Sequence, residues 1–355
     1  MAKYVAYLGS YTNENSDGIH IFDVDTEKGT FTHRDEVTVN NPSYLTASKD
    51  KRFLYSIVDE GISAFEIEKE GYLSLLNTKW IGGLRGCYVT VDSQNRYLFI
   101  GGYHDGRVTM MSLNEDGSVN DVACGIFHEG YGISAVDQRL EPKVTCVELS
   151  PDEKYLYTVD YGIDQVIVYE IDYLRGKLEE RTIIRLPLGS NPRMVRISKD
   201  NKFAYVLSEK RNKIEVYKII NEGGKLDHEN IQTVSVIKEA YMTAAASALE
   251  MSGDEEYMFA SVDAVNSLAC LKRDVRKGTL NFEFDFRVSG DYPKFISIMP
   301  GKRFVVSLNH DSDEMVAFEL NYKHKHALMR TAPIKVNQPN CLKIVKLPES
   351  DNNDK

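Results

Sequence analysis

A short hydrophobic pattern recurs along the chain, in which a charged or polar residue precedes an aromatic residue and a run of apolar ones. The copies are KYVAYLG at Tyr4, KRFLYSI at Phe53, NRYLFIG at Tyr97, EKYLYTV at Tyr155, NKFAYVL at Phe203, EEYMFAS at Tyr257 and KRFVVSL at Phe304. Successive copies are 44 to 58 residues apart. Self-similarity at such a period predicts a repeat architecture in which each copy is one structural unit.

Each full repeat contains more than one strand-like segment. An apolar strand precedes the copy, as in PRMVRISKD, and an alternating strand follows it, as in KIEVYKI. A more polar fourth strand comes next. Four short strands with tight turns are typical of a propeller blade. Residues 238–251 alone suggest a helix, and their position in the repeat predicts an inner strand instead.

The two ends of the sequence complement each other. The first copy has no inner strand before it, whereas Gln338 to Leu347 supplies an inner strand without a blade. Pairing that segment with Lys3 to Tyr11 would close the ring and remove an exposed sheet edge. We therefore predict an all-β fold, a single seven-bladed β-propeller domain over residues 1–348, followed by a flexible tail at 349–355.

Composition narrows the classes of partner. The 355 residues carry a formal net charge of −10, which argues against nucleic acid and anionic membranes as partners. The 5 cysteines are scattered without a CxxC motif, so we expect core thiols rather than disulfides or metal ligands. The N-terminus alternates like a strand and shows no apolar leader, so a cytoplasmic location is expected. The oligomeric state stays open.

The first residues of the inner strands are expected to surround one mouth of the central channel. Aligning the repeats places these residues there: Ser43, Gly86, Lys143, Arg193, the pair Ser247 and Ala248, Lys294 and Asn340. Three are cationic although the whole protein is acidic. One interpretation is a socket for a carboxylate or phosphate, clamped by the paired N–H groups of Arg193. The other is a set of salt bridges between neighbouring blades.

Glu209 is expected at the same mouth. It lies sixteen residues after Arg193, at the end of the next strand, and an antiparallel return brings it back beside that arginine. Its carboxylate could balance the charge of Arg193 or take a proton from water as a general base. The sequence leaves both roles open.

Several segments together resemble a known family. YLGSYTNENSDGIHIF, NPSYLTAS, GGYHDGRV, VDYGIDQVIVYEID, NPR followed by SE, and NHDSDEMVAFEL resemble the 6-phosphogluconolactonase-like lactonases, and eukaryotic carboxy-muconate cyclases are similar. The resemblance covers residues 3–347 and implies seven blades and a mouth with histidines, two arginines and a glutamate. Arg193 and Glu209 match the first arginine and the glutamate.

Other positions depart from the family pattern. Lys143 and Thr145 stand where the family has a Pro-His-x-His pair, and Met194 follows Arg193 in place of histidine. Lys294 replaces the second arginine, and Ala248 replaces an acidic residue that is frequent there. Lysine and threonine do not shuttle protons near neutral pH unless their pKa is strongly shifted. The positive charge of the mouth is retained, which favours anion recognition.

Some polar residues near the mouth could supplement the missing groups. Tyr103 and His104 lie in GGYHDG, His310 lies in NHDSD, and Asn340 lies at the entry of the last inner strand. We expect them to contribute to substrate binding, with exposed loop positions as the alternative for the histidines.

The resemblance implies hydrolysis of a sugar-acid lactone, such as the 6-phosphogluconolactone of the pentose phosphate pathway. Arg193, Lys294 and Lys143 would hold the small anionic substrate and Glu209 would activate water, without a metal or organic cofactor. One alternative is a catalytically lapsed propeller that binds an anionic metabolite or a protein partner. Another is a muconate-cyclase-like reaction, which needs no hydrolytic water.

Overall fold

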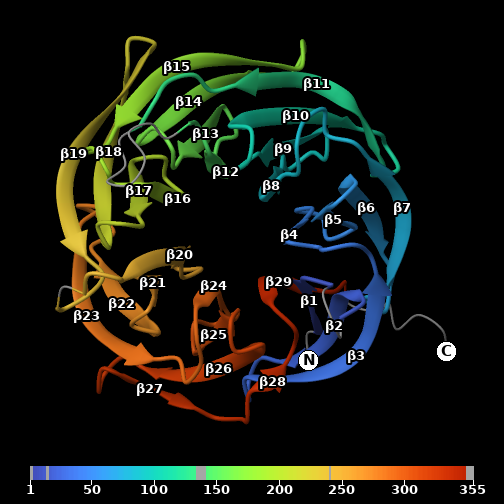
Figure 1. Cartoon of the computed structure of the whole chain (residues 1–355), viewed down its shortest axis with the longest axis vertical. Helices are drawn as coiled ribbons and strands as arrows, with labels where there is room; N and C mark the ends of the chain where they lie inside the picture. Colours follow the sequence, from blue (N-terminus) through green and yellow to red (C-terminus); the bar gives the residue numbers. More distant parts are fainter. Residues whose placement is uncertain (1–2, 13–15, 133–140, 240, 349–355) are drawn as a thin grey trace.

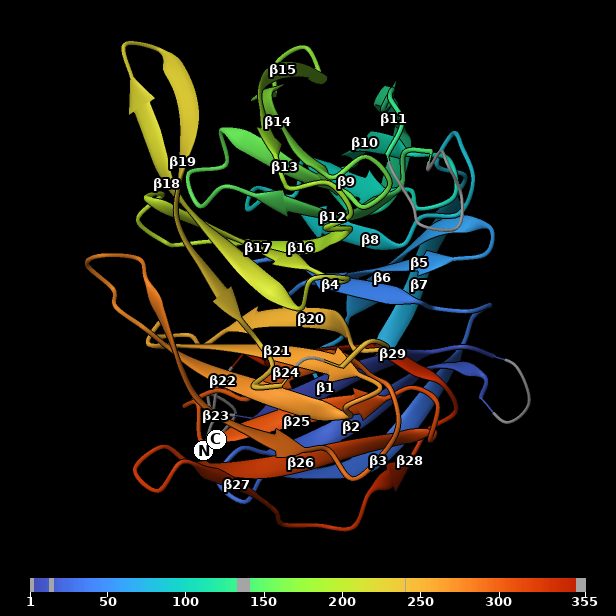
Figure 2. The same ribbon diagram turned by 60° about the vertical axis from the view of Figure 1, so that its left-hand side comes forward.

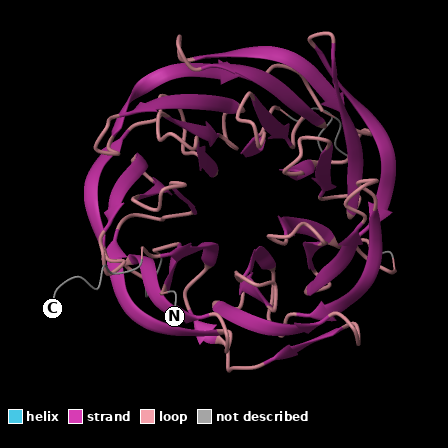
Figure 3. Ribbon diagram, turned by 180° about the vertical axis from the view of Figure 1, so that it is seen from behind, coloured by secondary structure: helices cyan, strands magenta, loops and turns pink. Residues whose placement is uncertain are grey.

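Seven β-sheets stand around a central channel in the computed structural model (Figure 1). The structure describes residues 3–12, 16–132, 141–239 and 241–348, and these contain strands and loops but no helix (Figure 3). The predicted seven-bladed propeller is confirmed, and the predicted tail at 349–355 lies outside the described residues. No helix in the described part of the chain is long and apolar enough to cross a membrane.

Each sheet runs from the channel to the rim through four strands. The inner strands are β29 (Pro339–Lys346), β4 (Tyr44–Ala47), β8 (Tyr88–Val91), β12 (Val144–Leu149), β16 (Pro192–Ile197), β20 (Ala245–Met251) and β24 (Pro293–Ile298). The second strands are β1 (Tyr4–Ser10), β5 (Phe53–Val58), β9 (Tyr97–Gly101), β13 (Tyr155–Asp160), β17 (Phe203–Ser208), β21 (Tyr257–Asp263) and β25 (Phe304–Asn309).

The third strands are β2 (Gly18–Asp25), β6 (Gly61–Ile67), β10 (Arg107–Leu113), β14 (Gln165–Asp172), β18 (Lys213–Glu222), β22 (Ser267–Arg273) and β26 (Glu314–Asn321). The outer strands are β3 (Thr30–Thr38), β7 (Leu73–Lys79), β11 (Val119–Phe127), β15 (Lys177–Arg185), β19 (Lys225–Ser235), β23 (Leu280–Arg287) and β27 (His326–Met329). A short strand, β28 (Ile334–Lys335), also pairs with β26.

The burial of the strands explains the hydrophobic pattern. Every residue of β5, β17 and β25 is buried, because neighbouring blades cover both faces of the second strand. The outer strand β19 exposes many of its side chains to solvent and is correspondingly polar. Residues 245–251, which share a helix-like composition, form the inner strand β20 as expected.

The ring closes through its first sheet. β29 pairs antiparallel with β1, and Figure 2 shows the red strand β29 beside the blue strand β1. Ser10 lies opposite Pro339 there, as Ser208 lies opposite Pro192 in β17 and β16. Counting back from these serines makes Val5 the equivalent of Phe203, so aligning the first repeat on Tyr4 was wrong by one residue.

Glycines in the turns before the outer strands lock neighbouring blades together. Gly278 has a φ of +74°, and a Cβ built on it would lie 2.2 Å from Cδ1 of Phe203 in the preceding blade. Gly29 and Gly117 are placed in the same way against Phe304 and Phe53. A side chain at these positions would therefore separate two blades as well as strain the backbone.

Gly278→Ala is expected to lower the free energy of unfolding by about 1–3 kcal/mol, because it combines a left-handed backbone with a clash against Phe203. Gly224→Ala is the matched control, since Gly224 has a φ of +79° and a Cβ at that position would have no other atom within 4 Å. Denaturant melts of both variants measure the difference. Equal losses of unfolding free energy in the two variants would show that the clash with Phe203 adds nothing to the backbone strain.

Candidate active site at the channel mouth

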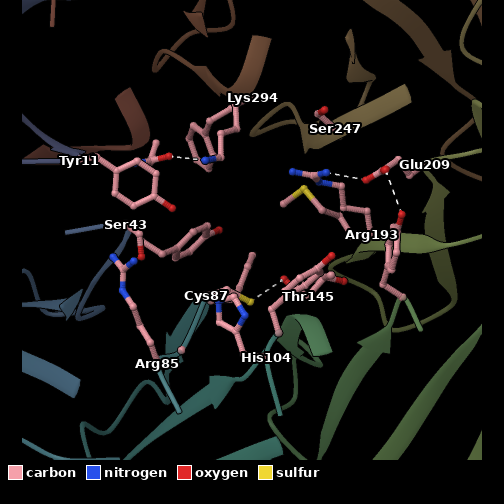
Figure 4. A pocket seen from close by; sticks show the side chains of 18 of the residues that line it. Tyr11, Ser43, Arg85, Cys87, His104, Thr145, Arg193, Glu209, Ser247 and Lys294 are labelled. Atoms are coloured by element: carbon pink, nitrogen blue, oxygen red, sulfur yellow. Dashed lines mark hydrogen bonds and ion pairs between the residues drawn. The ribbon is translucent and has the colours of Figure 1, made fainter. Parts of the chain in front are cut away.

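A cavity of about 420 Å³ opens at one mouth of the channel, within the size range of small-molecule sites. Figure 4 shows its side chains converging from several blades. Ten of the residues that the sequence placed at the mouth line it: Ser43, Gly86, Tyr103, His104, Thr145, Arg193, Glu209, Ser247, Lys294 and Asn340.

Irregularities at the start of the inner strands position the lining side chains. The register with the second strand shifts between Pro192 and Met194, and again between Pro293 and Phe295. A β-bulge of this kind leaves one residue unpaired and re-aims its side chain. Arg193 and Lys294 are the residues at the two shifts, and both side chains lie in the cavity (Figure 4).

Glu209 lies beside Arg193, as the antiparallel return from β17 predicted. Its backbone N–H donates to the carbonyl of Asn191 at 3.0 Å. One carboxylate oxygen, Oε2, accepts from Nη1 of Arg193 at 2.5 Å, and Oε1 accepts from the Tyr161 hydroxyl at 3.3 Å. Each oxygen has a second lone pair that a water molecule can use.

Arg193 has a second protein partner and further donors to offer. Its Nη2 donates to the hydroxyl of Tyr292 at 3.2 Å. Burial alone would lower the pKa of Arg193, but Tyr292 and Glu209 outweigh burial and raise it, so the guanidinium is charged. The two bonds to side chains use two of its five N–H groups. The others can serve an oxygen atom inside the cavity.

Lys294 is a second cation with a different environment. Its Nζ donates to Oδ1 of Asn340 at 2.6 Å and lies 5.0 Å from the ring centre of Tyr11. Within the described residues no carboxylate is within ion-pair distance of it. Burial, together with the charge of Arg193, lowers the pKa of Lys294 to about 7. A bound anion would supply the missing negative charge and favour the protonated amine.

Lys143 does not line the cavity, contrary to the sequence alignment. Its Nζ lies 5.0 Å from the ring centre of Tyr103. In β12 the register shift falls between Val144 and Cys146, so Thr145 occupies the position of Arg193. The backbone N–H of Lys143 donates to Asp160 at 2.8 Å, which holds Lys143 in the loop just before β12.

The two predicted histidines have different positions. His104 lines the cavity beside Tyr103. His310 is buried outside the lining, packed edge-on against the rings of Tyr11 and Tyr292. Burial and the nearby charge of Lys294 lower the pKa of His310 to about 4, so it is neutral at physiological pH. His310 therefore supports the cavity wall and does not face a ligand.

Several lining residues were missed by the sequence reasoning. Arg85 is a third cation, and its Nε lies 3.2 Å from Asp59 of the neighbouring blade. In the strand-to-strand register of this blade, Cys87 and not Gly86 has the position equivalent to Arg193, and Cys87 lines the cavity. Burial raises the pKa of the Cys87 thiol to about 12. The tyrosines that line the cavity beside these groups are Tyr11, Tyr44, Tyr88, Tyr161 and Tyr292. Arg85 could have been found from the sequence, because it directly precedes Gly86, which the alignment placed at the mouth.

Salt bridges between blades, the alternative considered for the mouth cations, are made by Arg85 at the mouth and by Arg196 further along β16. Arg196 follows Arg193 by three residues along β16. Its Nη2 lies 3.0 Å from Glu250, and its Nη1 lies 3.4 Å from Glu148. Arg196 thus joins three blades, whereas the charges of Arg193 and Lys294 remain at the cavity.

Comparison with known proteins identifies the family. The family described as "Lactonase, 7-bladed beta-propeller" matches residues 5–344. The chain belongs to this lactonase family. The cavity at the channel mouth is the candidate active site of this lactonase-family protein.

Individual relatives agree with this assignment. A 6-phosphogluconolactonase of Bacillus subtilis is 28% identical over 352 residues, which cover 97% of this chain and 99% of that protein. The crystal structure of a putative 6-phosphogluconolactonase from Bacteroides fragilis is 28% identical with a TM-score of 0.88, over 97% and 98% of the two chains. A periplasmic gluconolactonase from Pseudomonas aeruginosa, 24% identical over 98% and 100% of the chains with a TM-score of 0.89, shares the fold.

Proposed function

We propose that this lactonase-family protein hydrolyses a phosphorylated sugar-acid lactone, such as 6-phosphogluconolactone, at the channel mouth. The observation that carries the proposal is the contact between Arg193 and Glu209 in the same cavity as the half-buried amine of Lys294. A general base, a charged donor and an uncompensated cation are the groups that hydrolysis of an anionic ester requires. The activity named for the Bacillus subtilis relative supports the same substrate class.

In the proposed reaction Glu209 accepts a proton from a water molecule as that water attacks the lactone carbonyl. The carbonyl oxygen becomes an oxyanion, which the remaining N–H groups of Arg193 stabilise. The tetrahedral intermediate then collapses, the ring C–O bond breaks, and the leaving oxygen takes the proton that Glu209 accepted, which gives the hydroxy acid and restores the carboxylate. Lys294, held by Asn340, binds the phosphate of the substrate. These steps use the chain's own residues.

The substrate preference tests the role of the cations. We expect kcat/KM for 6-phosphogluconolactone to exceed that for unphosphorylated gluconolactone by about tenfold or more, because the neutral substrate leaves the half-buried Lys294 without an anionic partner. A pH-stat measures acid release, with a buffer blank that subtracts spontaneous opening. Equal values for the two lactones would contradict phosphate recognition.

A non-catalytic anion-binding propeller is the second candidate. Thr145 stands on the inner strand β12 at a position where the lactonase family pattern described above has a histidine. In that case 6-phosphogluconate would raise the melting temperature while the protein left the rate of lactone opening unchanged. The lactonase proposal further predicts that the protein is cytoplasmic and that its partners are small molecules only.

The charge of Lys294 gives a pH dependence. With a pKa of about 7 in the free protein, Lys294 loses its proton as pH rises through 7. We expect kcat/KM for the phosphorylated lactone to fall about tenfold per pH unit above that value, since kcat/KM reports the free enzyme.

Lys294→Arg is the control for this prediction. A guanidinium keeps its charge throughout this range, so the alkaline decline is expected to disappear in the variant. Initial rates between pH 6 and 8.5, each corrected with its own buffer blank, measure the two profiles. The same decline in both proteins would assign it to another group.

A further inference from the structure

A cluster of two histidines and a glutamate lies in the blade formed by β29, β1, β2 and β3, and none of the three residues lines the cavity at the channel mouth. His20 on β2 pairs directly with Glu36 on β3, and Phe22 pairs with His33. The Nε2 of His20 lies 3.3 Å from Oε1 of Glu36. One potential ligand atom from each of His20, His33 and Glu36 lies within 4.8 Å of the other two, the one such group of three among the described residues.

A β-bulge makes this arrangement possible. Residues three apart in a regular strand point to opposite faces of the sheet. The register between β2 and β3 shifts between Ile21 and Phe22, so one extra residue separates His33 from Glu36. The shift brings both side chains to the face that carries His20, and the rings of His20 and His33 have centres 5.9 Å apart.

The outer strands of other blades have the same bulge without this set of side chains. In the blade of β4 to β7, the residues equivalent in register to His20, Glu36 and His33 are Ser63, Thr78 and Leu75. In the blade of β16 to β19, they are Glu215, Thr233 and Asn230. The repeat architecture therefore does not require two histidines and a carboxylate there.

We propose that His20, His33 and Glu36 bind a Zn²⁺ ion. Two imidazoles and one carboxylate form a donor set that zinc uses when its fourth position is open to another ligand. In a tetrahedral site with bonds near 2.1 Å, neighbouring ligand atoms are about 3.4 Å apart. The pair formed by His20 and Glu36 already has this spacing, and His33 is exposed, so its ring has room to turn toward them.

The surroundings of the cluster suit a metal ligand. The hydroxyl of Ser16 lies 3.1 Å from Nε2 of His20, and Glu36 accepts the backbone N–H of Asp17 at 2.7 Å. The second contact orients the carboxylate, as outer contacts do in metal sites. Ser16 or water can take the fourth position.

Direct titration tests the proposal. Untagged full-length protein, stripped with a chelator and then freed of it, is titrated with Zn²⁺ by calorimetry. We expect one ion per chain, and at least a tenfold weaker affinity in His33→Ala and in Glu36→Gln. The double variant His324→Ala with His326→Ala removes an exposed histidine pair on the last blade and is expected to bind as the wild type does.

Two further readouts do not depend on catalysis. Zn²⁺ should raise the melting temperature of the wild type and not of His33→Ala, because it binds the folded state. An anomalous difference map at the zinc edge should place the ion at bonding distance from His20 Nε2. Absence of a stoichiometric site, or a loss of binding in the His324 and His326 variant only, would overturn the proposal and leave a hydrogen-bonded polar cluster.

Discussion

Replacing Glu209 with glutamine is expected to lower kcat for 6-phosphogluconolactone by about 10²–10⁴-fold, because an amide cannot take a proton from the attacking water. Gln has the same shape, and its single amide oxygen can still accept the bond from Arg193 while its NH2 group donates to the Tyr161 hydroxyl, so the cavity should keep its geometry. Binding of the product should change much less than turnover. Steady-state rates with a buffer blank, together with thermal melts, measure both effects.

Glu215→Gln is the matched control for this substitution. Glu215 is a carboxylate of the same blade, lies on β18 and accepts from Ser208 at 2.6 Å, but it does not line the cavity. Its replacement is expected to leave kcat within about threefold of the wild type. If Glu209→Gln behaved like this control, the carboxylate of Glu209 would balance the charge of Arg193 and have no part in proton transfer.

The second large effect is expected at Arg193. Removing its side chain in Arg193→Ala should reduce kcat/KM by about 10²–10³-fold, the loss typical of a donor to a developing oxyanion. It should also lower the melting temperature, because Glu209 would keep its buried position without its cationic partner. Activities must therefore be normalised to the folded fraction measured by circular dichroism.

Two variants separate these consequences. Arg193→Lys keeps a positive charge beside Glu209 but loses the fork of paired donors, so its kcat/KM should lie between those of Arg193→Ala and the wild type. Arg211→Ala removes an arginine that pairs with Glu215 at 3.4 Å outside the cavity, and activity should persist. Wild-type turnover in Arg193→Ala would contradict the assigned role.

Much of the fold follows from local pattern. Alternation within each strand and apolar runs in the second strands are set by burial between neighbouring sheets, and these are visible in one sequence. The closure through β29 was predictable because the C-terminal segment completes the first blade. The position of Glu209 followed as well, since an antiparallel hairpin returns the chain to its starting point.

The mouth was harder to predict where backbone irregularities set the register. Pro142 and Lys143 look like Pro192 and Arg193, yet the bulge in β12 places Thr145 at the arginine position. The carboxylate of Asp160, seventeen residues later, holds Lys143 in its loop. A contact of that range leaves no local signal in the sequence.

Arg85 and the histidine cluster were missed for related reasons. Arg85 reaches the cavity beside Tyr11 and pairs with Asp59 of another blade, so its position depends on how blades pack. His20, His33 and Glu36 have no recognisable ligand spacing, because a bulge in β3 brings them to one face. We expected no metal site from the sequence, and the proposed zinc site departs from that expectation.

The time course of 6-phosphogluconolactone opening, followed by NMR with and without the protein at pH 6.5, tests the central claim most directly. The account predicts a saturable acceleration over buffer that disappears in Glu209→Gln and persists in Glu215→Gln. An opening rate equal to that of buffer, with correctly folded protein in excess, would contradict hydrolysis of this lactone at the channel mouth.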